Sequence, residues 1–459
     1  MEPSVVVVGA GPVGLWLACE LALADVPVLV VEREPERGAL SKALGLHART
    51  LEVLAMRGRH EPFLDEGTAV SEWHFGLLES RIDFRPLDTP YPYMLSFPQA
   101  RTEQLFEDFA RELGVRIHRG QTVTAIQQNT DCVTVETSET TVHTRYVVGC
   151  DGAGSTVRKA AGIPFVGTDA SAHAILGEVT LDSPPAPGLP QWNNQGHLIV
   201  IPLGAGRHRI VAWDPTQRQS DTPLTLTELR ATTLRLAGTD FGMRDPVWLS
   251  RFGNATRVAG RYRDGRVLLA GDAAHMQFPT GGVGLNVGIQ DAMNLGWKLA
   301  AVAQLRAPET LLDTYHDERH PVGVALAENT MAQTALLTGI SPEQRALRAL
   351  LNEMIATQPE FALALAKKLT ALDVTYPAGE CHPSVGSRAP VGDAERLFAL
   401  MHTGRPVVVA APEMPLWDAV TAAVIRPDGH VWWATEDRVD PDRLVKQALA
   451  ALPARFDLM

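Results

Sequence analysis

The stretch SVVVVGAGPVGLWLACELALADVPVLVVERE, residues 4–34, decides the fold that we expect for this chain. Its valine run is continuous and β-branched, as a strand buried on both faces of a parallel sheet requires. The glycine pattern G-x-G-x-x-G follows, and then a helix-length segment and a second apolar run at residues 28–31. This order predicts one β-α-β unit of a dinucleotide-binding fold.

Each glycine of this pattern has a steric reason to be there. Gly9 permits the tight turn, Gly11 lets the backbone approach a pyrophosphate, and Gly14 lets the helix pack closely on the sheet. The helix also directs its free N-terminal N–H groups toward the phosphates. The loop that we expect to hold the phosphates comprises Gly9, Gly11, Pro12, Val13 and Gly14.

The second strand of the unit ends in Glu32 and Arg33. An acid at this position accepts hydrogen bonds from the adenosine ribose hydroxyls of a bound dinucleotide. A glycine-rich turn without a ligand is the alternative, and the preceding strand, the following helix and the spacing of the acid disfavour it. The pattern alone does not distinguish NAD from FAD.

Composition limits the remaining possibilities. The 459 residues predict two or three domains, and the net charge of −12 argues against nucleic acid as the main partner. No run approaches the roughly 20 apolar residues that span a bilayer, and no signal peptide is evident, so we expect a cytoplasmic protein. The four cysteines form no CxxC pair. His316 and His320 lack the H-E-x-x-H order, so no metal site is expected.

Two further motifs stand later in the chain, GCDGAGSTVR at residues 149–158 and GDAAHMQFPTGGVGLN at residues 271–286. An apolar run before the second predicts a buried strand that delivers Asp272 at its carboxyl end, where open α/β sheets bind ligands. A turn or helix-capping aspartate is the alternative. Arg158 can pair with a phosphate or an acidic neighbour, or it can pack as an ordinary arginine.

The rest of the chain departs from the β-α-β order. Residues 173–213 alternate in polarity and carry a proline-rich interruption, which predicts an antiparallel sheet. The remaining predicted elements are long helices at roughly 284–304, 309–338 and 342–372, a linker VGSRAP at 385–390, a strand at 407–410, a hairpin turn at 427–429 and a closing helix from Asp442.

In this order and spacing, the three motifs resemble those of the FAD-dependent aromatic hydroxylases, the single-component flavin monooxygenases of the para-hydroxybenzoate hydroxylase type. LGLHARTLEVL, PQARTE and LLDTYHDERHPVG resemble stretches of the actinobacterial hydroxylases of angucycline and anthracycline polyketides. The resemblance covers about residues 4–385 and implies an α/β fold with an inserted antiparallel sheet. It implies a Rossmann-like FAD-binding domain with long helices (1–72, 98–172, 258–385), a substrate-binding β-sheet domain (73–97, 173–257) and a shortened thioredoxin-like C-terminal domain (386–459).

The resemblance also assigns residues to the flavin. It places Asp272 on the ribityl hydroxyls, and Pro279 beside the ring carbon that takes up oxygen. The helix N-terminus at Leu285 and Asn286 would stabilise the negative charge of the reduced ring. His275 is expected to give structural support rather than acid–base catalysis. The other residues implied are Gly282, Lys42, Gln99, Val123 and Asp151 for cofactor binding, and Arg49 with Pro279 for catalysis.

For function, the resemblance implies an FAD-dependent monooxygenase that uses O2. No second dinucleotide fingerprint is present, so NADPH or NADH should bind transiently and hand its hydride to the flavin. The reduced flavin would form a hydroperoxide, whose distal oxygen an electron-rich phenolic ring attacks. We expect the substrate to be a polycyclic aromatic polyketide, an intermediate of antibiotic biosynthesis, and the enzyme to be a monomer or homodimer. Candidates to line its site, each of which could equally be core, are His74, Phe75, Trp192 and Trp213.

Two alternatives stay open. The same flavin chemistry could insert oxygen in the Baeyer–Villiger manner or open a ring of a related polyketide or antibiotic. A flavin-binding protein that holds a ligand without turnover is a more remote alternative, which the intact GGVGLN loop disfavours.

Overall fold

The computed structural model describes residues 2–186, 191–378, 381–410, 420–437 and 443. It is built around a six-stranded sheet in which five strands run parallel and one edge strand runs antiparallel. In spatial order the strands are β20 (Arg263–Asp264), β21 (Val267–Leu269), β12 (Tyr146–Gly149), β1 (Val5–Val8), β2 (Val28–Val31) and β8 (Arg116–His118).

Strand β1 lies between β2 and β12, so the strand order reverses on either side of it. Such a reversal opens a crevice at the carboxyl ends of the strands, where ligands of α/β sheets bind. The register aligns Val8 with Gly149, and Gly149 with Leu269. The segments that follow β1, β12 and β21 therefore emerge at one edge, and these are the three motifs of the sequence.

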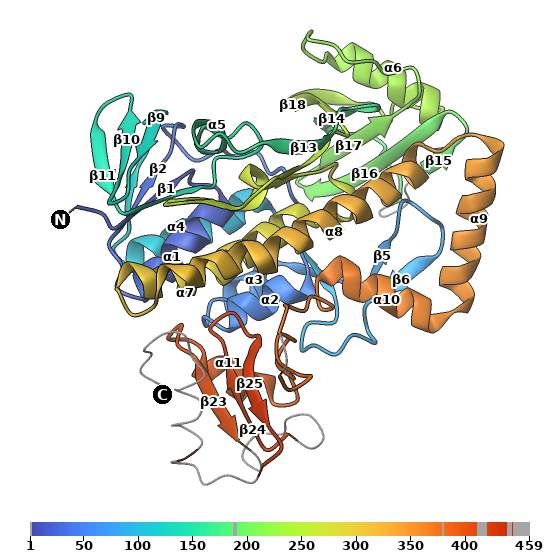
Figure 1. The fold of residues 1–459 in the computed structure, drawn as a ribbon. Coiled ribbons are helices and arrows are strands. Elements are labelled where there is room, and N and C mark those ends of the chain that lie inside the picture. Colours follow the sequence, from blue (N-terminus) through green and yellow to red (C-terminus); the bar gives the residue numbers. More distant parts are fainter. Residues whose placement is uncertain (1, 187–190, 379–380, 411–419, 438–442, 444–459) are drawn as a thin grey trace.

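One face of the sheet is covered by long helices and the other by a small antiparallel sheet (Figure 1). Helix α1 packs against both α4 and α7. The close approach of α1 to α7 depends on small residues, since a Cβ on Gly296 would lie 2.5 Å from Glu20 Cβ. These elements are α1 (Pro12–Leu23), α4 (Gln99–Glu112), α7 (Gly284–Ala303), α8 (Asp313–Thr338), β9 (Val123–Gln128), β10 (Val133–Thr137) and β11 (Thr141–Thr144).

The predicted antiparallel sheet is confirmed, and it has five strands. Helix α6 (Leu226–Ala237) covers one of its faces, and the other face turns toward the rest of the molecule (Figure 1). The strands, in spatial order, are β15 (Gln191–Asn193), β16 (Gly196–Gly204), β17 (Arg207–Trp213), β14 (His173–Thr180) and β18 (Arg244–Gly253).

Short elements connect these layers. They are β3 (Gly45–Leu46), α2 (Ala48–Ala55), α3 (Glu61–Glu66), β4 (Thr68–Val70), β5 (Glu72–His74), β6 (Arg81–Asp83), β7 (Met94–Ser96), α5 (Thr156–Ala160), β13 (Phe165–Thr168), β19 (Thr256–Ala259) and β22 (His275–Met276).

The single long helix predicted at 342–372 is wrong. The structure has two helices, α9 (Pro342–Thr357) and α10 (Pro359–Thr370). Gln358 between them has φ −121° and ψ 91°, because a residue that precedes a proline is driven out of the helical conformation.

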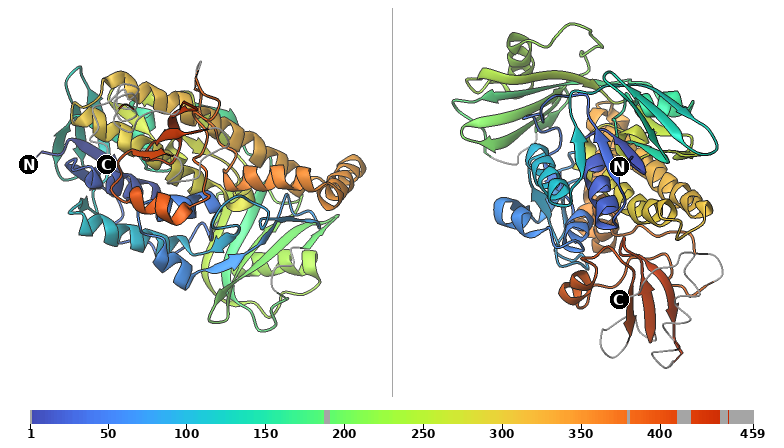
Figure 2. Two further views of the ribbon diagram at one scale, coloured as in Figure 1. Left: turned by 90° about the horizontal axis from the view of Figure 1, so that it is seen from below. Right: turned by 90° about the vertical axis from the view of Figure 1, so that its left-hand side faces the viewer.

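The C-terminal segment forms helix α11 (Ala394–Leu400) and an antiparallel sheet of β23 (Val407–Ala410), β24 (Ala422–Ile425) and β25 (Val431–Thr435). Figure 2 shows it as a separate lobe beneath the helices. The predicted strand and hairpin are thus confirmed, whereas the helix expected from Asp442 lies, apart from residue 443, outside the described residues. Residues 385–390 are not a free linker, because Gly386, Ser387 and Ala389 hydrogen bond with the hairpin backbone.

Within the described part of the chain, no helix combines the length and the apolar character needed to cross a membrane.

Candidate active site

The N-terminal glycine loop is closed on its protein side and open on the other. Gly9 has φ +105°, and a Cβ there would lie 2.5 Å from the carbonyl oxygen of Cys150. A Cβ on Gly14 would lie 2.0 Å from the carbonyl oxygen of Gly9. No atom stands within 4 Å of the corresponding position on Gly11, so the backbone is bare where a pyrophosphate is expected.

Glu32 lies directly beside this loop. Its carboxylate accepts hydrogen bonds from the N–H of Ala10 at 2.7 Å and of Glu34 at 2.9 Å. Each carboxylate oxygen has a further lone pair, so the group closes the loop and can still accept from a ribose hydroxyl. Arg33 instead extends into solvent, where it pairs with Glu34. The carbonyl of Glu32 accepts from Gln121, which brings the start of β9 at Val123 to the same edge.

The second motif is organised by Asp151 and Arg158. Asp151 Oδ2 accepts from the N–H groups of Thr156 and Val157, at 2.7 and 3.2 Å, and Oδ1 is buried without a partner among the described residues. The Arg158 guanidinium donates to the carbonyls of Ala273 (3.0 Å) and Ala153 (2.8 Å). Arg158 therefore ties the second motif to the third. Two of the five N–H donors of Arg158 thus go to backbone carbonyls, and no ion pair of Arg158 is found among the described residues.

Asp272 lies in the turn that follows β21, at the carboxyl end of the sheet. Its side chain is exposed, and no described residue hydrogen bonds to its carboxylate. The protein packed around it raises the pKa of this carboxyl by desolvation, while His275 and Lys42 oppose the shift. A carboxylate that the protein surrounds but does not pair is suited to accept hydrogen bonds from ligand hydroxyls.

A buried ionic network holds the turn that carries Asp272. Asp291 of α7 accepts from Arg319 Nε at 2.7 Å and contacts His275 Nε2 at 2.8 Å. Its Oδ2 also accepts from the N–H of Gly271 at 3.1 Å. All three side chains are almost fully buried. Burial opposes ionisation of Asp291, but Arg319 and His275 together lower its pKa. His275 thus braces the turn, which is the supporting role expected from the sequence.

The glycine loop that follows this turn, residues 279–284, is stabilised by hydrogen bonds of two side chains, those of His47 just after β3 and Asn286 of α7. We call this pair the clasp. Asn286 Nδ2 donates to the carbonyls of Gly282 (3.0 Å) and Gly45 (3.1 Å), and Oδ1 accepts from the N–H of His47 at 2.8 Å. His47 Nε2 lies 2.9 Å from the carbonyl oxygen of Gly281. Burial lowers the pKa of His47 to about 4, so the neutral ring donates to that carbonyl.

The clasp gives the loop its shape. Gly281 and Gly282 have φ +72° and +67°, which glycine adopts without strain. No protein atom lies within 4 Å of a Cβ built on Gly282, and Pro279 at the head of the loop is exposed. Val287 is the first residue of α7 whose N–H reaches a preceding carbonyl, that of Val283. The earlier N–H groups, those of Leu285 and Asn286 included, are free to face a ligand.

Val13 joins the two glycine loops. A Cβ on Gly271 would lie 2.9 Å from Val13 Cγ2, and one on Gly288 would lie 2.6 Å from the same atom. The first turn of α1 thus packs directly against the third motif and the start of α7. The phosphate loop and the Asp272 loop form one continuous surface at the sheet edge.

The model of the FAD binding domain family matches residues 2–330, a span that contains all three motifs. The chain belongs to this family. An aromatic compound monooxygenase of Bacillus subtilis, itself uncharacterised, is 45% identical, with 95% of each chain covered. The rifampicin monooxygenase of Streptomyces venezuelae is 42% identical, with 98% of each chain covered. Among solved structures, an anhydrotetracycline hydroxylase from Streptomyces rimosus superimposes with a TM-score of 0.90 at 39% identity, over the whole of both chains.

This chain is an FAD-dependent monooxygenase of the aromatic hydroxylase type. The site fits FAD on the geometry of its own residues. The bare backbone at Gly11 and Gly282 leaves room for phosphates and for a flat ring. Neither the carboxylate of Asp272 nor the buried Oδ1 of Asp151 has a hydrogen-bond partner among the described residues.

The segment 41–43 is held on two sides beside the flavin site. Gln99 Oε1 accepts from the N–H of Ala43 at 3.0 Å, and its Nε2 donates to Glu103 at 2.7 Å. From the five-stranded sheet, Arg209 donates to the carbonyls of Ser41 and Lys42 and pairs with Glu178. The Lys42 side chain itself is exposed. Arg209 could not be identified from the sequence, because its contact is with a segment far away in the chain.

Arg49 makes contacts of another kind. It is 3% exposed, and it donates to Glu52 at 2.7 Å and to the carbonyl of Asp428 at 2.7 Å. Its guanidinium is therefore engaged with the C-terminal segment.

The substrate candidates divide between two apolar clusters that flank the glycine loop. Trp213 is buried with Phe278, the residue before Pro279, and Trp192 Nε1 donates to the Leu337 carbonyl at 3.1 Å. Phe75 packs in the other cluster with Val283 and Val287 of α7.

His74 stacks on Trp73, with ring centroids 4.9 Å apart. Burial, aided by the charges of Arg81 and His197, lowers its pKa to about 3. His197, which the sequence did not single out, stacks on Trp213 at 5.6 Å, and burial lowers its pKa to about 4. Both rings are thus neutral at physiological pH.

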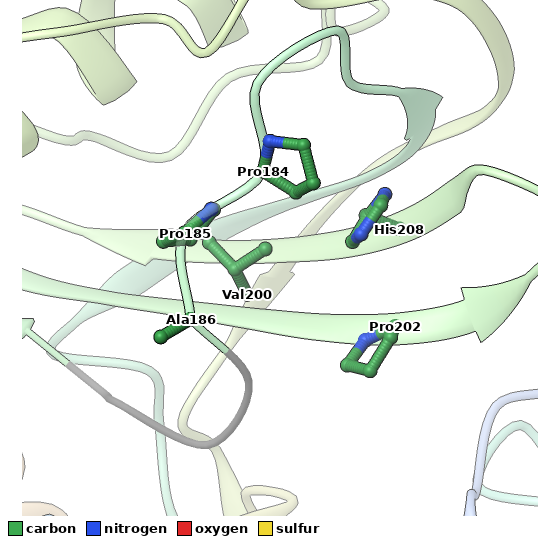
Figure 3. A pocket seen from close by; sticks show the side chains of 6 residues that line it. All are labelled: Pro184, Pro185, Ala186, Val200, Pro202 and His208. Carbon is green, nitrogen blue, oxygen red and sulfur yellow. The ribbon is translucent and has the colours of Figure 1, made fainter.

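A hollow of about 330 Å³ lies elsewhere, on the α6 side of the five-stranded sheet (Figure 3). Its wall carries prolines and one imidazole, with no carboxylate and none of the flavin-site residues. It is lined by Pro184, Pro185, Ala186, Val200, Pro202 and His208. Val200 packs in the cluster beneath α6, so this hollow and the flavin site lie on opposite faces of the sheet.

Proposed function

We propose that this enzyme hydroxylates a phenolic, polycyclic aromatic compound of the polyketide type, with NADPH or NADH and O2 as co-substrates. The observation that carries the proposal is a contact between the segment after Asp272 and the five-stranded sheet. The ring of Phe278 stacks on that of Phe252 in β18, with centroids 5.3 Å apart. The names of the relatives support it, since they act on tetracycline- and rifampicin-type compounds.

When bound, FAD supplies the redox chemistry, accepting a hydride and activating oxygen. In the proposal the chain's residues hold and polarise it. Asp272 accepts from the ribityl hydroxyls, Glu32 from the ribose, and the N–H groups of Leu285 and Asn286 stabilise negative charge at the ring edge. Pro279, which has no N–H, keeps the loop rigid where oxygen reacts.

We further propose that the substrate lies between the glycine loop and the five-stranded sheet, within the domain boundaries expected from the sequence. His74 of β5 and Trp192 of the sheet, which are both half-buried, would contact it. Phe75 and Trp213 are 8% and 6% exposed and would act through packing around the loop. Neutral imidazoles and aromatic faces suit a flat phenolic ring.

We propose a cytoplasmic enzyme that works as a monomer or homodimer. The absence of a disulfide among the described cysteines supports this location.

The proposal is tested by presenting purified, FAD-loaded enzyme with a panel of phenolic tetracyclic and angular aromatic compounds under ¹⁸O2. We expect NAD(P)H oxidation to rise with the correct ligand, and the product to gain one ¹⁸O as a new phenolic hydroxyl by NMR. Catalase and a peroxide assay separate true oxygenation from uncoupled oxidation, and para-hydroxybenzoate serves as the small-ring control.

Two outcomes would replace the proposal. A labelled lactone or an opened ring would establish Baeyer–Villiger or ring-opening oxygenation, the second candidate. Tight ligand binding without any rise in NAD(P)H oxidation across the panel would indicate a protein that holds its ligand without turnover.

A further inference from the structure

The hairpin turn Pro427–Gly429, between β24 and β25, is buried against the flavin-binding part of the chain although it belongs to the C-terminal segment. Asp428 is 3% exposed and Arg426, just before the turn, 4%. The C-terminal sheet lies below α2 in Figure 1, with the turn inserted toward α2, α7 and α8.

On one side the turn is held by arginines of the α2 region. Arg49 Nη2 donates to the carbonyl of Asp428 at 2.7 Å. Arg57, just beyond the end of α2, donates to the carbonyl of Pro427 at 3.0 Å and forms a paired contact with Glu20 of α1 at 2.7 and 2.8 Å. The backbone of the turn thus takes two guanidinium donors that are buried themselves.

On the other side the turn is held by α7 and α8. Arg426 makes two hydrogen bonds of 2.8 Å with the carboxylate of Glu318, which also accepts from Lys298 at 2.7 Å. Trp297 Nε1 donates to Asp428 at 3.3 Å. Although burial opposes it, the charges of Arg426 and Lys298 lower the pKa of Glu318 to about 2. Glu318 is therefore ionised at neutral pH, and the geometry of its partners is tightly specified.

The helices joined by this network are the ones that carry the flavin loop. Helix α2 begins one residue after His47, and α7 begins with the glycine loop and Asn286. The two helices pack on each other, and the His47–Asn286 clasp joins their N-terminal ends. The turn is held by Arg49, in the first turn of α2 close to His47, and by Arg57 just beyond the far end of α2. A displacement of the turn therefore changes how α2 packs on α7 directly beside the clasp.

We propose that the 427–429 turn is a positioning element of the flavin site. By holding α2 against α7 it fixes the clasp of His47 and Asn286, and so sets the affinity for FAD and the environment of its ring. Arg49 acts through this turn, as a positioning residue, in place of the direct catalytic role that the sequence suggested. The inference depends on FAD binding and is independent of which substrate is oxidised.

Gly429→Ala tests the turn from the C-terminal side without a change of charge. Gly429 has φ +77°, which strains any other residue, and a Cβ there would meet Met56 Sδ at 2.8 Å and Arg49 Nη2 at 3.0 Å. The Arg49 contact with the turn must therefore shift. Arg49→Lys tests the same contact from α2 and retains the charge beside Glu52. We expect both variants to bind FAD about tenfold more weakly, the loss of roughly one charge-assisted hydrogen bond. We also expect both to change the visible circular dichroism of the bound flavin.

The control is Glu436→Gln, which removes an exposed ion pair with His382 in the same segment and should leave both readouts at the wild-type level. The melting temperature of each apoprotein is measured beside them. Wild-type FAD affinity and flavin dichroism in both test variants, whatever their melting temperatures, would reduce the turn to a structural contact and overturn the proposal. A loss confined to Arg49→Lys would assign Arg49 to the flavin directly and would also overturn it.

Discussion

The two glycine loops of this enzyme lie at the same sheet edge, touch through Val13, and are built in different ways. The N-terminal loop is shaped by backbone contacts, since Gly9 and Gly14 leave no room for a side chain. The second loop is shaped by side chains from distant segments, namely the clasp of His47 with Asn286 and the network of Asp291. The shape of the first loop thus follows from close contacts between its own backbone atoms, whereas the shape of the second depends on side chains from other segments.

The difference matches what each loop has to hold. A pyrophosphate needs bare N–H groups on a rigid backbone, which glycines at fixed spacing provide. A reacting ring needs a helix N-terminus and a carboxylate held at fixed positions, which requires bracing behind them. Substitutions in the bracing residues should therefore damage the second loop and spare the first.

The largest expected effect follows from Asp291→Ala. This change leaves Arg319 and His275 buried without their shared carboxylate, and removal of one partner of a buried pair costs about 3–5 kcal/mol. Chemical denaturation of the apoprotein measures it. Asp313→Ala on α8 removes an exposed pair with Arg263 and should cost under about 1 kcal/mol. Equal losses in the two variants would contradict the bracing role.

Gly14→Ala should be next, at about 3 kcal/mol, because its Cβ would stand 2.0 Å from a backbone oxygen that cannot move aside cheaply. Gly11→Ala is its matched partner, since a Cβ there meets no protein atom. We expect Gly11→Ala to cost the apoprotein under about 1 kcal/mol and to weaken FAD binding. If Gly11→Ala bound FAD normally, that face of the loop would not contact the pyrophosphate.

The clasp predicts a pH dependence. The pKa of His47 is about 4 in the folded protein, below its ordinary 6.5, so the unfolded chain takes up the proton first. The stability due to neutral His47 is complete above pH 6.5 and is lost as the pH falls toward 4, by about 2 kcal/mol at pH 5. Because other buried histidines titrate as well, the test is the difference between wild type and His47→Asn. The two unfolding free energies should converge as the pH falls; a constant difference would show that His47 is not neutral.

The smallest effect on stability is expected from Asp272→Asn. Asp272 has no hydrogen-bond partner among the described residues, and its raised pKa means that its charge opposes folding once the pH rises above its ordinary value of 3.8. The variant apoprotein should therefore be at least as stable as wild type at pH 7, with the advantage vanishing in acid. FAD affinity should fall about tenfold by fluorescence titration. A variant that is less stable and binds FAD normally would remove Asp272 from the ribityl site.

The contrast between the loops also shows which parts of the site could be predicted from the sequence. The N-terminal loop is recognisable because its constraints lie within residues 5–32 and glycine spacing records them directly. Asp272 and Pro279 are recognisable because a strand, an acid and a glycine-rich helix start stand next to one another in the chain. Pro359, which separates α9 from α10, is also visible in the sequence, although a single helix over 342–372 was predicted.

The remaining site residues carried no local signal. Asp291 and Arg319 look like ordinary polar residues of two helices, and His47 like one residue in a loop. The position of Arg49 beside that loop suggests a catalytic role, whereas its contact with Asp428, 379 residues later, has no signal in the sequence. No periodicity or spacing connects such pairs.

The sequence by itself determined the first β-α-β unit, the nature of the cofactor site and the positions that must be glycine. Local steric constraints and the hydrophobic pattern act over short stretches, so the sequence records them directly. Only the tertiary structure decided which buried charges pair and what holds the reacting loop. Those choices depend on desolvation and hydrogen-bond geometry between groups that meet only after helices α2, α7 and α8 and the C-terminal turn have packed together.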